Sequence, residues 1–389
     1  MKQTAKIRLR TGFTGYYGMN NFGDDLFGAI CVAAARELWQ AEPLLVGPPL
    51  NHVDAATTVP GWFSARAYGA AGMVGKAGRL LSFYRGLHGS DVLVMGGGSV
   101  INDRESFRKP MMLAAKRSRG VQLAAIGVSI GPFKSAESQS RVASFIQEFA
   151  YVSVRDRRSF QLATEMGLSR TLHDGRDLAG LLPSLDAAPP KPRAAPGARL
   201  TIGVAPCNYA DGGEYQAVPR AKWEDATVEA LAMLARTRPV DVLLFSLNEH
   251  PVHGDQQIAD RMRQALLLRG VEATRWRYAG SSPRAAVEAL GRCDAIISAR
   301  LHGAIVAYMQ GVPFCIVDYH PKCKDFANDV GLPPLQCITS RFCDAAAVGA
   351  GVQSMLDQAN GPALSPIDYA NQAQEVFNCA PWTQTQASL

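Results

Sequence analysis

The sequence lacks any stretch of about 18 apolar residues free of charge, so it predicts no transmembrane helix. Its most apolar region, residues 294–318, is interrupted by Arg300, His302 and Gly311. The opening residues, MKQTAKIRLRTGFTGYYG, contain no continuous apolar run and do not resemble a signal peptide. We therefore expect a cytoplasmic protein, for which peripheral contact with the inner face of a membrane stays open.

The chain also lacks closely spaced cysteines. Eight are scattered along it, and no two have CxxC spacing. Cys31 and Cys315 lie in apolar segments, where cysteine acts as a small hydrophobe. A disulfide framework is not indicated for a chain of this length, so a reducing compartment fits best.

Metal-binding and nucleotide-binding signatures are missing as well. His250 and His253 are three residues apart, but Pro251 between them prevents a pair inside a helix, and no third ligand is near. No GxxxxGK[ST] loop occurs, which argues against a P-loop enzyme. We expect neither a metal site nor a cofactor.

The overall composition indicates a two-domain globular protein. The 389 residues are 47% hydrophobic and 19% charged, and single cores stop growing near about 250–300 residues. The Pro-rich segment 186–199, DAAPPKPRAAPGAR, suits a linker because proline removes backbone donors and fixes φ. We predict a first domain over residues 1–185, a second over 200–364, and a C-terminal tail over 365–389.

The net charge of +6 is modest. A solvated basic surface is the favoured explanation, and a preference for anionic small molecules or a lipid-linked phosphate is the next. Aromatic residues do not interleave with basic ones as a single-strand platform requires, so we expect no nucleic acid partner.

Apolar runs alternate with helical patterns in both halves of the chain. Expected strands in the first half are residues 7–13, 44–46, 91–95, 123–126 and 150–154, and expected helices are 26–39 and 157–166. In the second half the expected strands are 200–205, 240–246, 295–298 and 314–317, and the expected helices are 223–236, 255–268, 285–291 and 301–310. This alternation predicts an α/β fold of two Rossmann-like domains with parallel sheets, and a ligand cleft at the carboxyl ends of the strands.

Two glycine-containing motifs occur in the first half. The loop GYYGMNNFGDD, residues 15–25, joins the first strand to a helix, so its glycines permit close backbone approach and its helix end favours an anion. An ordinary βα turn capped by Asp24 or Asp25 is the simpler alternative. The second motif is Gly96-Gly97-Gly98-Ser99, whose amides suit a phosphate or carboxylate.

Two arginine motifs follow. Ser153-Val154-Arg155-Asp156 places Arg155 at the carboxyl end of a strand, where its fork can bind a carboxylate or phosphate; an Arg–Asp pair tying strand to helix is the alternative. The strongest motif is Ser298-Ala299-Arg300-Leu301-His302-Gly303, a strand that enters a helix. Fixed positive charge, a titratable imidazole and helix N–H groups converge there, which suits an anionic substrate that must also receive a proton.

The ordered set of motifs resembles the polysaccharide pyruvyltransferases: GxxGxxNxGD[DE], GGGS, SVRD, and RLH followed by Gly311-Val312-Pro313. The resemblance spans residues 13–332. It implies a fold similar to the type B glycosyltransferases. It also implies transfer of a pyruvyl group from phosphoenolpyruvate to a sugar of an exopolysaccharide or cell-surface glycan precursor, with release of phosphate and formation of a pyruvate ketal. The implied donor residues are Arg155, Arg300, Leu301 and His302.

The residues predicted to bind substrate are Asn21, Gly97, Gly98, Ser99, Arg155, Arg300 and Leu301. His302 is the candidate general acid, and Asp24 or Asp25 is the candidate base. The expected partners are phosphoenolpyruvate and a sugar or lipid-linked oligosaccharide. A type B glycosyltransferase using a nucleotide-sugar is the alternative, and a non-catalytic sugar-binding protein of a polysaccharide machine is the third possibility.

Overall fold

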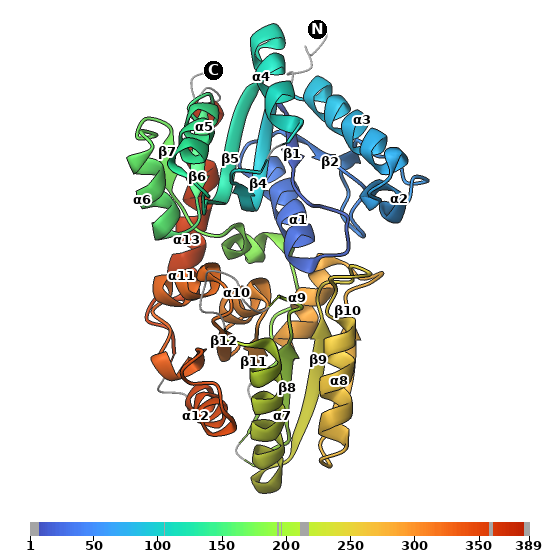
Figure 1. The fold of residues 1–389 in the computed structure, drawn as a ribbon, viewed down its shortest axis with the longest axis vertical. Helices are drawn as coiled ribbons and strands as arrows, with labels where there is room; N and C mark the ends of the chain where they lie inside the picture. Colours follow the sequence, from blue (N-terminus) through green and yellow to red (C-terminus); the bar gives the residue numbers. More distant parts are fainter. Residues whose placement is uncertain are drawn as a thin grey trace, which may run out of the picture. The chain divides into compact units, whose positions relative to one another are not determined.

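Strands and helices alternate through the chain, as the sequence predicts. The structure, a computed structural model, describes residues 8–104, 106–192, 194–195, 197–210, 218–357 and 361–384 (Figure 1). Contacts divide the chain into two compact units. Unit 1 comprises residues 1–19, 24–185 and 371–389, and unit 2 comprises residues 20–23 and 186–370.

Unit 1 is built around a parallel sheet. Its strands are β1 (Arg10–Thr14), β2 (Glu42–Val46), β3 (Ala56–Thr57), β4 (Val92–Ile101), β5 (Gln122–Ile130), β6 (Tyr151–Val154) and β7 (Leu172–Asp174). The sheet order is β3-β2-β1-β4-β5-β6-β7, with all neighbours parallel. The associated helical segments are α1 (Phe22–Glu37), α2 (Ala65–Gly69), α3 (Met73–Gly89), α4 (Arg108–Arg119), α5 (Ala136–Ile146), α6 (Arg157–Glu165) and the 3-10 segment η1 (Leu178–Leu185).

Unit 2 repeats this plan. Its strands are β8 (Leu200–Ala205), β9 (Val240–Ser246), β10 (Glu272–Arg277), β11 (Ala295–Ser298), β12 (Phe314–Val317) and β13 (Cys337–Ile338), in the parallel order β10-β9-β8-β11-β12-β13. Its helical segments are α7 (Arg220–Thr237), α8 (Gln256–Leu267), α9 (Pro283–Gly291), α10 (Leu301–Met309), α11 (Pro321–Asp329), the 3-10 segment η2 (Pro334–Gln336) and α12 (Ala345–Leu356).

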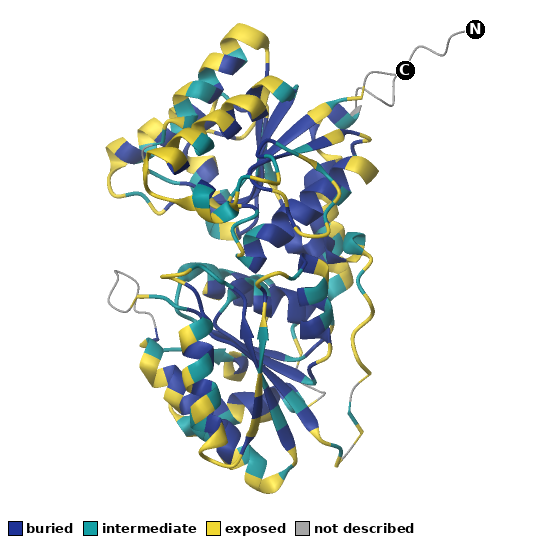
Figure 2. Ribbon diagram, turned by 90° about the vertical axis from the view of Figure 1, so that its right-hand side faces the viewer, coloured by how far each residue is buried: buried dark blue, intermediate teal, exposed yellow. Residues whose placement is uncertain are grey.

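The cores lie between each sheet and its helices, where Figure 2 shows the strands buried and the outer helix faces exposed. In unit 1, Leu93, Leu123 and Val152 come from adjacent strands and are fully buried. In unit 2, Ile202 of β8 and Ile297 of the adjacent β11 are likewise fully buried. Each strand order reverses next to its first strand, between β1 and β4 and between β8 and β11. Ligands of open α/β sheets bind at such reversals, beyond the carboxyl ends of the strands.

Two strands extend further than expected. The sequence predicts a strand that ends before Gly96, but β4 continues through the GGGS motif to Ile101. Gly97 and Gly98 adopt φ of 77° and 88°, and the pairing with β5 shifts register just after Gly98. Glycine tolerates these angles, so the strand kinks and continues instead of ending. β5 likewise continues to Ile130, beyond the expected end at residue 126.

The C-terminal residues form α13 (Pro366–Asn378) and α14 (Pro381–Gln384), and those from 371 onward belong to unit 1. The Trp39 indole donates to the carbonyl oxygen of Phe377 at 2.8 Å, and the Tyr151 hydroxyl donates to that of Val376 at 2.9 Å. Trp382 packs edge-on against Trp39. This segment therefore completes the core of unit 1. In the described residues, no helix is both long and apolar enough to cross a membrane.

Candidate functional site

Arg300 lies at the carboxyl end of β11 and is the N-cap of α10. Its Nε and Nη2 atoms donate to the two carboxylate oxygens of Asp255 at 2.9 and 2.5 Å. Asp255 is fully buried. Burial lowers the pKa of the guanidinium, but the neighbouring Cys207 and Asp255 raise it by more, so the net direction is upward. Arg300 is thus a fixed cation held in one orientation.

Asp255 also connects two further strand ends. Its Oδ1 accepts the backbone N–H of Asn208, after β8, at 3.1 Å, and its Oδ2 accepts that of Asn248, after β9, at 3.0 Å. The carboxylate therefore ties three strand ends together at the reversal of the sheet. The sequence predicts Asp255 only as the start of a helix, and its position two residues after His253 gives no sign of this role.

His302 lies in the first turn of α10 and is half-buried, with its Nε2 atom buried. The backbone of Gly23 packs directly against its ring: a Cβ built on Gly23 would lie 2.0 Å from Nδ1 of His302. Any other residue at position 23 would force either the imidazole or the loop to move. The first and fourth motifs of the sequence therefore meet within unit 2. Leu301, predicted to bind substrate, has a buried side chain. At the start of α10 it can therefore offer a ligand only its backbone amide.

The segment before Gly23 is anchored to the same part of unit 2. Asn21 pairs with Asn248 in an isolated antiparallel bridge. The Phe22 amide donates to the carbonyl oxygen of Leu247 at 2.9 Å, and the Glu249 amide donates to that of Asn20 at the same distance. These contacts hold Asn21 beside the β9 end, which fits its predicted place in a binding site.

The end of β12 adds more polar groups. His320 is the N-cap of α11, and its Nδ1 accepts the backbone N–H of Lys322. The Lys322 ammonium lies 5.5 Å from the centre of the Tyr319 ring, which stacks on Tyr209 at 4.4 Å. The Arg220 guanidinium, at the start of α7, donates to the side chain of Asn208. Cationic side chains thus follow three of the four central strands of unit 2.

Arg155 lies in unit 1, at the carboxyl end of β6 as predicted. Its side chain is 6% exposed and makes an ion pair with Asp177 at 2.9 Å. It also donates to the hydroxyls of Ser129 at 2.7 Å and Ser99 at 3.2 Å. The alternative of an ion pair between Arg155 and the adjacent Asp156 is not observed. Asp156 is instead the N-cap of α6 and accepts the Ser159 amide. Arg155 therefore anchors the GGGS strand to the β6 end.

Residues 127–131, GVSIG, have the spacing of a serine-hydrolase elbow. Ser129, however, lies within β5 and is 2% exposed. Its hydroxyl donates to Asp156 at 2.7 Å while it accepts from Arg155. A nucleophile elbow requires an exposed serine on a sharp strand-to-helix turn, so this serine is structural.

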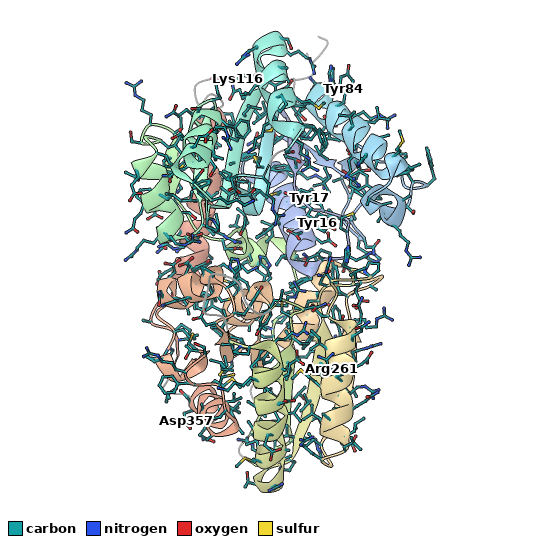
Figure 3. The ribbon with its side chains drawn as sticks, viewed as in Figure 1. Tyr16, Tyr17, Tyr84, Lys116, Arg261 and Asp357 are labelled. Carbon is teal, nitrogen blue, oxygen red and sulfur yellow. The ribbon has the colours of Figure 1, made fainter. Side chains whose placement is uncertain are left out.

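The other predicted residues of unit 1 surround the β1 and β4 ends. Tyr17, labelled with Tyr16 in Figure 3, donates its hydroxyl to the Gly96 carbonyl at 2.6 Å. Asp25 is buried and accepts the Gly18 amide at 2.7 Å, so it holds the loop closed. Asp24 is only half-buried. Of the two carboxylates proposed as base, Asp24 is the more accessible.

Gly97 packs against Phe27, while Ser99 is exposed. Ser99 borders a cavity of about 380 Å³. The cavity is also lined by Thr14, Tyr16 and Asn102, by cationic Arg108 and Lys109, and by apolar side chains such as Phe83. Within the described residues, no cluster of three or more His, Cys, Asp or Glu side chains is arranged to hold a metal ion.

Comparison with known proteins identifies the family. The model of the polysaccharide pyruvyl transferases matches residues 21–321, so the chain belongs to this family of transferases. A search of curated proteins found no match. Among solved structures, MnaA of S. aureus in complex with UDP is 8% identical, with a TM-score of 0.55 over 98% of this chain and 95% of that one. The UDP-GlcNAc 2-epimerase of Neisseria meningitidis bound to UDP-GlcNAc is also 8% identical, with a TM-score of 0.53 over 98% and 99%. At this identity the likeness concerns the fold, which is that of two Rossmann-like domains.

Proposed function

We propose that the protein transfers a pyruvyl group from phosphoenolpyruvate to two hydroxyls of a glycan sugar, forming a cyclic ketal and releasing phosphate. Membership of the polysaccharide pyruvyl transferases supports this proposal. The donor is a small trianion that carries both a carboxylate and a phosphate. A site for it needs several fixed positive charges and a proton donor close to them.

The main support for this proposal is the cluster of cationic side chains and His302 beyond the strand ends of unit 2. Arg300 is fixed by two contacts to Asp255, and His302 follows it within the same helical turn. Lys322 lies in the first turn of α11, and Arg220, in the first turn of α7, contacts Asn208 just after β8. The N-termini of α7, α10 and α11 also start at this edge, and helix N-termini attract anions. We assign the donor site to this cluster.

The chemistry assigns distinct roles to these residues. Proton transfer from the His302 imidazolium to the methylene carbon makes the adjacent carbon electrophilic, and a sugar hydroxyl oxygen attacks it as that hydroxyl loses its proton. The C–O bond to phosphate then breaks, and the second hydroxyl attacks the same carbon to close the ketal. The proton of that hydroxyl passes to the His302 imidazole, which the first step left neutral. Arg300 stabilises the charge that leaves with the phosphate. Asp24 is the proposed base.

The cavity of unit 1, described by itself, has the chemistry to bind a sugar. Its hydroxyl and amide side chains, Thr14, Ser99 and Asn102, offer hydrogen bonds, and the ring of Tyr16 offers a flat apolar face. The acceptor is a sugar or a lipid-linked oligosaccharide. All eight cysteines lie in the described part of the chain as free thiols, which supports placement in the reducing cytoplasm.

The direct test is phosphate release from phosphoenolpyruvate in the presence of candidate sugar acceptors, with mass spectrometry of the product. A gain equal to one pyruvate minus one water on the acceptor is expected. Binding of phosphoenolpyruvate is compared by calorimetry with binding of UDP-sugars. Turnover of a nucleotide-sugar without phosphoenolpyruvate contradicts the proposal and favours a type B glycosyltransferase, whereas binding of neither donor favours a non-catalytic glycan-binding protein.

A further inference from the structure

The helix α3 of unit 1 carries large apolar side chains on its exposed face as well as on its buried face. Surface helices usually turn their large apolar side chains toward the core. In α3, the buried face carries the small residues Gly75, Ser82 and Gly86 beside Phe83 and Leu87. Its exposed side chains include Met73 (86% exposed), Leu80, Leu81 and Tyr84. Large apolar groups are therefore presented to the outside.

The small buried residues explain why the helix can lie this way. A Cβ on Gly86 would come within 2.5 Å of the Val46 side chain, and one on Gly75 within 2.1 Å of the Ala70 carbonyl oxygen. The helix consequently packs closely on β2 and α2 through these glycines. Its position is fixed by its buried face, so the exposed apolar side chains are not there to fill the core.

The exposed apolar residues form one stripe. Met73, Leu80 and Tyr84 are spaced i, i+7 and i+11, which places them on one side of a helix. Leu81 and Val74 lie next to this side. Trp62, 84% exposed, is connected to the same region because its neighbour Phe63 packs on Gly78 of α3. We call this surface, defined by Trp62, Met73, Val74, Leu80, Leu81 and Tyr84, the α3 face; Figure 1 shows α3 beside α2, and Tyr84 is labelled in Figure 3.

Positive charge accompanies the α3 face. Lys76 and Arg85, which lie on opposite sides of the stripe, are both exposed. Arg119 of α4 donates to the carbonyl oxygens of Leu87 and His88 at the end of α3. Between residues 62 and 119 the sequence has ten Lys or Arg against three Asp or Glu. Part of that excess lies away from the α3 face, because Arg108 and Lys109 line the cavity and Lys116 pairs with Glu148.

We propose that the α3 face docks unit 1 on a membrane surface rich in anionic phospholipid. A stripe of exposed apolar side chains flanked by lysine and arginine suits the boundary between headgroups and acyl chains. Each basic residue near an anionic surface adds attraction, which weakens with salt. The inference extends the proposed function, because a lipid-linked acceptor lies in such a surface, but binding to vesicles does not require catalysis.

The experiment is flotation of the full chain with vesicles of phosphatidylcholine alone or mixed with phosphatidylglycerol, without phosphoenolpyruvate. We expect binding to the mixed vesicles only, and weaker binding as salt increases. The variant L80E/L81E should bind at least about tenfold more weakly, since it removes apolar groups that enter the membrane. The matched control, L267E/L268E, changes exposed leucines of unit 2 and should bind as the unmodified chain does.

Thermal unfolding checks that the variant folds. L80E/L81E alters only exposed side chains, so its melting temperature should match that of the unmodified chain. Equal binding to both vesicle types, or unchanged binding of L80E/L81E, overturns the inference. A dimer in sedimentation velocity that L80E/L81E dissociates, with no vesicle binding, overturns it in favour of a contact between copies. Phosphate release with a water-soluble acceptor should be unchanged in this variant. If vesicle binding holds while phosphoenolpyruvate is never consumed, the proposed function fails and the membrane inference stands.

Discussion

Arg300 and Asp255 form a bidentate ion pair in which the carboxylate is fully buried and also accepts two backbone amides from other strand ends. The orientation of the arginine is therefore already set, which, in the proposed donor site, lowers the entropy cost of binding. Removing the carboxylate would leave a cation unpaired in a dry environment and two amides without an acceptor. The pair explains why an arginine, and not a lysine, stands at this position.

The variant Arg300→Lys should bind phosphoenolpyruvate at least about tenfold more weakly, because a lysine makes one point contact where the guanidinium makes several. Calorimetry measures the affinity. Arg275→Lys is the control: it alters another arginine of unit 2 paired with an aspartate, Asp260, outside the cluster. Unchanged affinity in Arg300→Lys would show that Arg300 stabilises the strand ends through Asp255 and does not bind the donor.

The variant His302→Gln should still bind phosphoenolpyruvate but lose turnover by about 10²–10⁴-fold, since glutamine keeps hydrogen-bonding capacity without a transferable proton. Steady-state kinetics should show kcat falling with KM little changed, which marks a contribution made in the transition state. Turnover near that of the unmodified enzyme would demote His302 to a binding residue.

Gly23→Ala tests how the loop and the imidazole are fitted together. The added methyl group would lie 2.0 Å from Nδ1 of His302, so either the ring or the loop must move. We expect a loss of kcat of about 10²-fold, because small misplacements of a catalytic group are costly. The control is Gly349→Ala in α12, where a Cβ meets nothing within 4 Å and alanine favours the helix. Full activity in Gly23→Ala would contradict the placement of His302.

The ion pair of Arg155 with Asp177 should contribute to the stability of unit 1. Both side chains are nearly inaccessible, so Asp177→Ala should lower the free energy of unfolding by about 3–5 kcal/mol. Chemical denaturation measures it. Glu137→Ala removes the partner of Arg141 in an exposed pair and should cost no more than about 1 kcal/mol. Equal effects of the two substitutions would show that the Arg155 pair adds no more than a surface pair does.

The regular elements of unit 2 were the most predictable from the sequence. The strands 240–246, 295–298 and 314–317 were placed with their observed bounds, because each is a short apolar run between turn residues. In unit 1, the helices α2, α3, α4 and α5 were not predicted. In α3, large apolar side chains are exposed as well as buried, so the usual one-sided apolar pattern is blurred. Part of the first expected strand, at residue 7, lies outside the described residues.

The site was predictable only where one motif contained it. Arg300 and His302 could be proposed from the sequence because they lie at a strand–helix junction. Asp255 was not, since its partners lie at positions 208, 248 and 300, and only the parallel sheet brings these strand ends together. The packing of Gly23 on His302 connects positions far apart in the chain and left no local signal in either motif.

Cysteine labelling should report the state of the C-terminal segment. Of the eight cysteines, all described, Cys379 alone is exposed, whereas Cys337 is half-buried and the others are buried. Burial and the nearby Glu375 carboxylate raise the pKa of the Cys379 thiol. Because the thiolate is the reactive form, labelling near neutral pH should be slower than that of a free cysteine, rising about tenfold per pH unit up to the raised pKa. Mass spectrometry should find one label per native chain, located at Cys379.

Burial raises the pKa of Cys337 to about 11, which keeps that thiol protonated over the same range. Prompt labelling of Cys31 or Cys315 at neutral pH would mean that the cores open readily, contrary to the packing described for both units.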